Sequence, residues 1–152
     1  MAIARGAGTE IIRTHQFEDV PGTSDAELII GVQHHIYTIL SITMYVNALN
    51  TAGTDYILGF IKCFDAYAGA TGQNIKIFKW TPSAVGETYV WNDKCSFNGA
   101  EPTGVSTIMN TVAEQDAIAD QGTTTAQGFA VNVSHASANF DIGITFIDQN
   151  NA

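Results

Sequence analysis

Charged residues are scarce in this chain, and positive ones are the scarcest. Asp, Glu, Lys and Arg make up 14% of the 152 residues, whereas about a quarter is usual for a soluble domain. Six Lys and Arg stand against fifteen Asp and Glu, and no Lys or Arg follows Lys94. The resulting net charge of −9 repels a phosphate backbone, so we expect no nucleic-acid partner.

Long apolar runs are also missing. A membrane-spanning helix needs about 20 consecutive apolar residues, and the longest candidate, 36–46, is interrupted by Tyr37, Thr38, Ser41 and Thr43. The first ten residues contain one Arg but no apolar signal-peptide core. We therefore expect no membrane span and no secretory signal.

Cysteine is limited to Cys63 and Cys95, which form no CxxC pair. A disulfide between them requires that strands 56–65 and 88–97 be neighbours with close Cα atoms. Without an export signal the chain stays in a reducing compartment, so we expect two free thiols.

Signatures of catalysis are absent as well. The chain has no GxGxxG, GxxxxGK[ST], GxSxG or HExxH motif. His34 and His35 are adjacent, and on a strand adjacent side chains point to opposite faces, so they cannot chelate one metal ion. We expect a protein that is not an enzyme and has no catalytic, cofactor-binding or metal-binding residues.

The dominant pattern in the sequence has a period of two. Within 36–48 the even positions are mostly apolar and the odd ones polar or aromatic, as in a half-buried strand. This segment exceeds the usual strand length, which predicts a bulge or bend inside it. Near the C-terminus, 129–134 and 140–146 alternate more clearly, and the short link 136–139 predicts a hairpin between them.

Further strands are predicted at 11–17, 26–32, 56–64, 75–80 and 88–97, separated by clusters rich in Gly or Pro. Segment 105–120 fits a short helix that ends near Gly122, followed by a loop over 121–128. We therefore predict an all-β protein with one domain, an antiparallel β-sandwich of the jelly-roll or immunoglobulin-like type. The sandwich spans 11–152 and is preceded by a flexible N-terminal arm, 1–10.

Five aromatic residues are candidates for a binding surface. Trp80, Tyr89 and Trp91 flank the loop 81–87, where they could form a platform for sugar rings, although tryptophans at strand ends more often fill a core or a subunit interface. Tyr37 and Tyr45 fall on the polar face of the long strand and fit an interface between subunits.

The segments SITMYVNALNTAG, YVWNDKCSF and FDIGITFIDQNNA resemble small β-sandwich structural proteins of tailed bacteriophage virions, in particular capsid decoration or cement proteins. The resemblance covers roughly residues 25–150. It implies a non-enzymatic homo-oligomer, with a trimer favoured, on the capsid surface of a virion assembled in the host cytoplasm. It also implies that the protein stabilises the head by bridging major capsid protein subunits.

Two alternatives remain open, and a third is disfavoured. The chain could be a carbohydrate-binding or receptor-binding module on a phage tail, using the aromatic platform. It could be a tail-tube or neck component, which is also β-rich, acidic and self-associating. A metal enzyme of the cupin type needs His and Glu at spacings that this sequence lacks.

Overall fold

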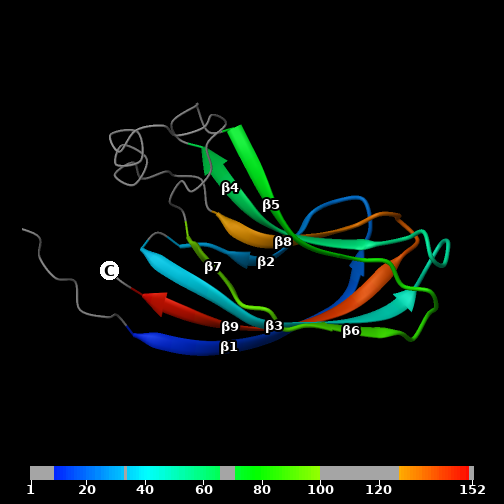
Figure 1. The fold of residues 1–152 in the computed structure, drawn as a ribbon, viewed down its shortest axis with the longest axis horizontal. Coiled ribbons are helices and arrows are strands. Elements are labelled where there is room, and N and C mark those ends of the chain that lie inside the picture. The colour runs from blue at the N-terminus through cyan, green and yellow to red at the C-terminus, as the bar shows by residue number, and fades with distance from the viewer. Residues whose placement is uncertain (1–8, 33, 66–70, 100–126, 151–152) are drawn as a thin grey trace, which may run out of the picture.

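The computed structural model describes residues 9–32, 34–65, 71–99 and 127–150, which form two antiparallel β-sheets packed face to face (Figure 1). The strands are β1 (Glu10–Pro21), β2 (Ala26–Ile30), β3 (His35–Ala48), β4 (Ile57–Asp65), β5 (Thr71–Trp80), β6 (Thr88–Trp91), β7 (Cys95–Asn98), β8 (Gly128–Val133) and β9 (Asn139–Asn150). No helix that is long and apolar enough to cross a membrane occurs among these residues. The prediction of a single all-β sandwich is confirmed.

The strand order bears on the type of sandwich. Sheet A has the order β1-β9-β3-β6, with β7 also paired to β3, and sheet B has the order β2-β8-β4-β5. Among the described strands, only β4 and β5 pair with a strand that is next to them in sequence. An immunoglobulin-like sandwich places its first two strands side by side, whereas here β1 and β2 lie in different sheets. Of the two predicted types, the strand order therefore favours the jelly roll.

The predicted alternation builds the core between the sheets. On β9 the even positions from Phe140 to Phe146 are buried, and on β8 the buried Phe129, Val131 and Val133 face them from sheet B. Burying these side chains between the sheets contributes to the hydrophobic stabilisation of the fold.

The hairpin predicted between 129–134 and 140–146 is wrong. The strand β8 pairs with β2 and β4 in sheet B, while β9 pairs with β1 and β3 in sheet A. The tight turn between them, closed by a 3.0 Å hydrogen bond from Ala138 N to His135 O, carries the chain from one sheet to the other. Alternation indicates which face of a strand is buried, and that face is the same whether the next strand lies beside it or across the core.

The bulge predicted in the long strand is confirmed. Between Ile39 and Ser41 the pairing of β3 with β9 shifts by one residue. The buried positions change there from odd (Tyr37, Ile39) to even, beginning at Ile42. The prediction that Tyr37 lies on the polar face is therefore wrong, because the bulge reverses the two faces of the strand before it.

The predicted strand 88–97 is divided in two. Both halves pair with β3, β6 after the bulge of β3 and β7 before it. Residues 92–94, which connect β6 to β7, are not part of a strand. The predicted helix within 105–120 lies outside the described residues, and so do the loop over 121–126 and residues 1–8 of the predicted arm. The last residue of that arm, Glu10, already belongs to β1.

Candidate interaction surfaces

The outer face of sheet A carries almost no charge. We call it the threonine face, and its charged side chains are Asp141 and, at the start of β1, Glu10. Its residues are Glu10, Ile12, Thr14, Gln16, Thr38, Ser41, Thr43, Tyr45, Thr88, Val90, Ser96, Asp141, Gly143, Thr145, Ile147 and Gln149. Three large apolar or aromatic side chains on it are well exposed: Ile12 at 68%, Val90 at 53% and Tyr45 at 43%. Such a surface is typical of one that a partner covers.

Hydroxyl groups on the threonine face bond to one another across strands. The hydroxyls of Thr38 and Ser96 lie 2.8 Å apart, and those of Thr14 and Thr145 lie 3.2 Å apart. These pairs satisfy part of the hydrogen-bonding capacity of the face without water, which lowers the cost of covering it.

A hollow of about 280 Å³ lies in the threonine face. It is lined by Gln16, Thr43, Tyr45, Asp141 and Gly143. A Cβ at Gly143 would meet only the Thr43 Cβ, at 4.0 Å, so the missing side chain leaves the hollow open. The Asp141 carboxylate at its rim is held by hydrogen bonds from Asn47 Nδ2, at 2.6 Å, and from the backbone N–H of Asp19, at 2.9 Å.

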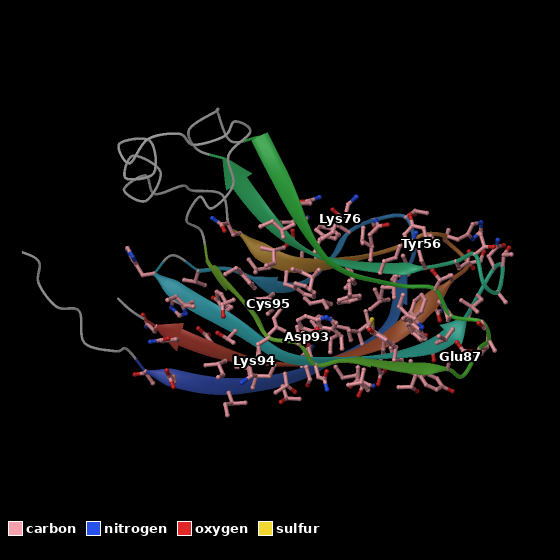
Figure 2. All side chains as sticks on the ribbon, in the orientation of Figure 1. Tyr56, Lys76, Glu87, Asp93, Lys94 and Cys95 are labelled. Carbon is pink, nitrogen blue, oxygen red and sulfur yellow. The ribbon has the colours of Figure 1, made fainter. Side chains whose placement is uncertain are left out.

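A second groove, of about 330 Å³, lies on sheet B beside the edge strand β5. It is lined by Tyr56, Leu58, Lys76, Ile77, Phe78 and Lys79. Tyr56 and Lys76 extend from the side of sheet B that faces away from sheet A (Figure 2). We call it the lysine groove. The groove was not predicted from the sequence, because two lysines three residues apart point to opposite faces of a regular strand.

A bulge brings the two lysines together. The register of β5 against β4 shifts by one residue, so that Lys76 pairs with Phe60 and Phe78 with Gly59, while Ile77 is the extra residue. This shift changes the parity of β5, and Lys79 then lines the same groove as Lys76. The ammonium of Lys79 lies 4.0 Å from the centroid of the Tyr56 ring, in a cation–π contact.

Two of the five aromatic candidates lie in the core. Tyr37 is 3% exposed and stacks on Phe97 with ring centroids 5.3 Å apart. Its hydroxyl accepts a 3.1 Å hydrogen bond from the backbone N–H of Val32, and burial raises the pKa of the phenol. Trp91 is 8% exposed and packs against Phe78. Both rings are therefore buried within the single chain.

Trp80 and Tyr89 lie where β5 faces β6 across the edge of the sandwich. Their rings stack with centroids 5.4 Å apart and planes 21° apart, and Trp80 also contacts Phe140 edge-on. Each ring covers one face of the other, so the pair closes this edge of the core. The platform of Trp80, Tyr89 and Trp91 is therefore not assembled. Tyr45 lies on the threonine face as predicted and is 43% exposed, and Tyr89, although stacked on Trp80, is 37% exposed.

An ionic network at the opposite end of the sandwich was not predicted. The buried Asp148 lies 3.0 Å from Arg13 Nε and 2.6 Å from His35 Nδ1, and the His35 ring stacks on Tyr37. The three polar residues come from three adjacent strands of sheet A, so only their pairing could reveal them. Arg13 and His35 supply hydrogen bonds to a carboxylate that would be costly to bury alone.

No group of three or more His, Cys, Asp or Glu side chains that could hold a metal ion occurs within residues 9–32, 34–65, 71–99 and 127–150. Two histidines have other roles, because His35 bonds to Asp148, and the Nδ1 of His135 accepts a hydrogen bond from the Ser137 N–H in the turn after β8.

Cys95 has a free thiol, as predicted, and burial raises the pKa of that thiol to about 11. Cys95 lies in sheet A, whereas Cys63 lies on β4 of sheet B, whose neighbours are β5 and β8. The strand pairing on which a disulfide would depend is therefore absent from the described ladders.

No protein-family model matches this chain, and no curated protein matches it in sequence.

Proposed function

We propose that this chain is a structural protein of a tailed-phage virion, a capsid decoration or cement protein. In this role copies of the chain associate with one another and lie on the head, where the threonine face of each copy rests on the major capsid protein. Many weak contacts of this kind strengthen a shell collectively, because each bound copy raises the effective concentration of its neighbour.

The threonine face is the observation that carries this proposal. Its outward side chains are nearly uncharged and include the exposed Ile12, Tyr45 and Val90. A free acidic domain gains solubility from charge on every face, and this chain, with a net charge of −9, has only Glu10 and Asp141 as charged groups on the threonine face. The sequence resemblance to decoration proteins agrees with such a covered face.

The test is binding of the purified chain to heads that lack it, measured by co-sedimentation. Thr43 and Val90 lie opposite each other on β3 and β6. The double variant Thr43→Lys/Val90→Glu places two charges on the face that compensate each other within the monomer. We expect this variant to fold and to lose head binding.

The matched control is Val85→Glu, in the exposed loop before β6, which should bind heads like the parent chain. If the parent chain does not sediment with heads, the decoration role is wrong. If the double variant binds as the parent does, the threonine face is not the contact.

Self-association is tested by light scattering after size exclusion. A stable trimer has three times the 16.2 kDa of the chain and supports a decoration role. A hexamer or larger ring favours a neck or tail component. A monomer at every concentration contradicts self-association in solution.

A carbohydrate-binding module is the second candidate, and the hollow at Gly143 favours it. A half-exposed Tyr45 ring beside the fixed Asp141 carboxylate and the amide of Gln16 combines a stacking surface with hydrogen-bonding groups, as sugar sites do. A glycan array on which the parent chain binds and Tyr45→Ala does not would support it. No signal from the parent chain would remove it.

A further inference from the structure

The lysine groove has positive charge that the described part of the chain does not neutralise. Of the four cations on described strands, Arg13 pairs with Asp148, and Lys62 pairs with Asp25 and Glu27. Neither Lys76 nor Lys79 has a carboxylate within 4.0 Å among the described residues. In a chain with fifteen acidic residues and six basic ones, two unpaired lysines at one groove are a local excess of positive charge.

The floor of the groove is apolar, and its side is an edge strand. Leu58 and Ile77 line the groove together with the lysines and Tyr56. In sheet B, β5 is the last strand, so one side of its backbone has no neighbouring strand among the described residues. A partner here would meet apolar surface flanked by two ammonium groups, which suits an acidic surface with some apolar contact.

The opposite edge of the sandwich has the complementary charge. At the bulge of β1, between Phe17 and Val20, the exposed Glu18 and Asp19 lie beside Asp141 of β9. Asn47 donates hydrogen bonds to both Asp19 and Asp141, but no cation pairs with these carboxylates among the described residues. We call Glu18, Asp19 and Asp141 the acidic corner.

The two charged sites lie on opposite edges and in different sheets. The lysine groove borders β5, which faces β6 through the contacts of Trp80 with Tyr89 and of Phe78 with Trp91. The acidic corner lies on β1, at the other end of the strand order of sheet A from β6. One copy can therefore present its acidic corner to the lysine groove of the next.

We infer that the lysine groove binds the acidic corner of a second copy of this chain, in a head-to-tail contact. This inference rests on the self-association in the proposed function and specifies its contact. A two-fold contact through the groove would bring its own lysines against each other, so it is disfavoured. A contact between two different surfaces closes only as a ring of three or more copies or continues as a filament.

The test is a charge swap measured by sedimentation velocity. Lys76→Glu places a negative charge against the acidic corner, so we expect it to weaken association by roughly tenfold or more. Lys94→Glu makes the same charge change at an exposed position in the link between β6 and β7, and it should associate like the parent chain. Lys76 and Lys94 are both labelled in Figure 2. Urea unfolding of each variant shows whether the fold is retained.

The second half of the swap is Glu18→Lys, which should weaken association alone and restore it when combined with Lys76→Glu in one chain. Restoration identifies Glu18 and Lys76 as facing groups. If the parent chain associates and Lys76→Glu associates equally well, the groove is not the contact, while self-association stands. A two-fold dimer of the parent chain overturns the head-to-tail arrangement. A monomeric parent chain overturns this inference together with the self-association.

Discussion

At the scale of single residues, Asp148 is a buried carboxylate with two side-chain partners. Its two oxygens contact Arg13 Nε and His35 Nδ1, and its side chain is buried at the end of the sandwich. Removing either the carboxylate or its partners leaves polar groups without a hydrogen-bond partner, which lowers stability. Because half of the Arg13 side chain remains in water, removing the carboxylate is less costly than breaking a fully buried pair.

We expect Asp148→Ala to lower the free energy of unfolding by about 1–2 kcal/mol, because His35 and Arg13 lose their hydrogen-bond acceptor. Asp93→Ala, in the exposed link after β6, is the matched control and should change stability little. Urea denaturation of both variants measures the difference. Equal midpoints would show that the network contributes nothing to stability.

The raised pKa of Cys95 predicts slow thiol chemistry. With a pKa of about 11 instead of the ordinary 9.0, little thiolate exists at pH 8. In a Cys63→Ser background, labelling by a disulfide reagent should be much slower in the native protein than in urea. The folded state should also lose stability as pH rises from 9.0 toward 11, because the unfolded chain releases this proton first. Rapid labelling of native protein at pH 8 would contradict the burial of this thiol.

At the scale of the strands, bulges decide which side chains share a surface. The bulge in β3 places Tyr37 in the core, the bulge in β5 joins Lys76 and Lys79 in one groove, and the bulge in β1 exposes Glu18 and Asp19. Each bulge changes the parity of its strand, so the surface on one side of it cannot be inferred from the pattern on the other.

Two strand glycines should respond oppositely to a methyl group. A Cβ at Gly59 of β4 overlaps the ring of Phe78 in the core, so Gly59→Ala should destabilise the fold by about 1–3 kcal/mol. Gly143 of β9 has room for a Cβ, so Gly143→Ala should leave stability unchanged or raise it by about 0.5–1 kcal/mol. Thermal unfolding compares them. A larger loss at Gly143 than at Gly59 would contradict the described packing.

At the scale of the whole molecule, charge is distributed between edges and faces. The threonine face is nearly neutral, the edge beside β5 has two lysines with no carboxylate partner among the described residues, and the edge at β1 is acidic. In the proposed assembly the charged edges join neighbouring copies and the threonine face lies on the shell, with Asp141 at the border between the two contacts. The two contacts therefore differ in their physical character.

This difference predicts opposite responses to salt. Raising NaCl from about 0.05 M to about 0.5 M should weaken association between copies, because exposed charge pairs are screened. Binding of the threonine face to heads should change little, since burial of neutral surface does not depend on charge. Light scattering and co-sedimentation across the same salt series measure both. Association that strengthens with salt would indicate an apolar contact between copies.

The sequence by itself determined the class of this fold and the identity of most core residues. Alternation with a period of two depends only on which side chains avoid water, so it marks strands and buried faces, and the excess length of 36–48 even indicated the bulge of β3. Alternation does not specify which strands hydrogen-bond to each other, because strands with the same buried face can pair in more than one order. Only the tertiary structure therefore decided that β8 and β9 lie in different sheets, that Asp148 meets Arg13 and His35, and that Lys76 joins Lys79.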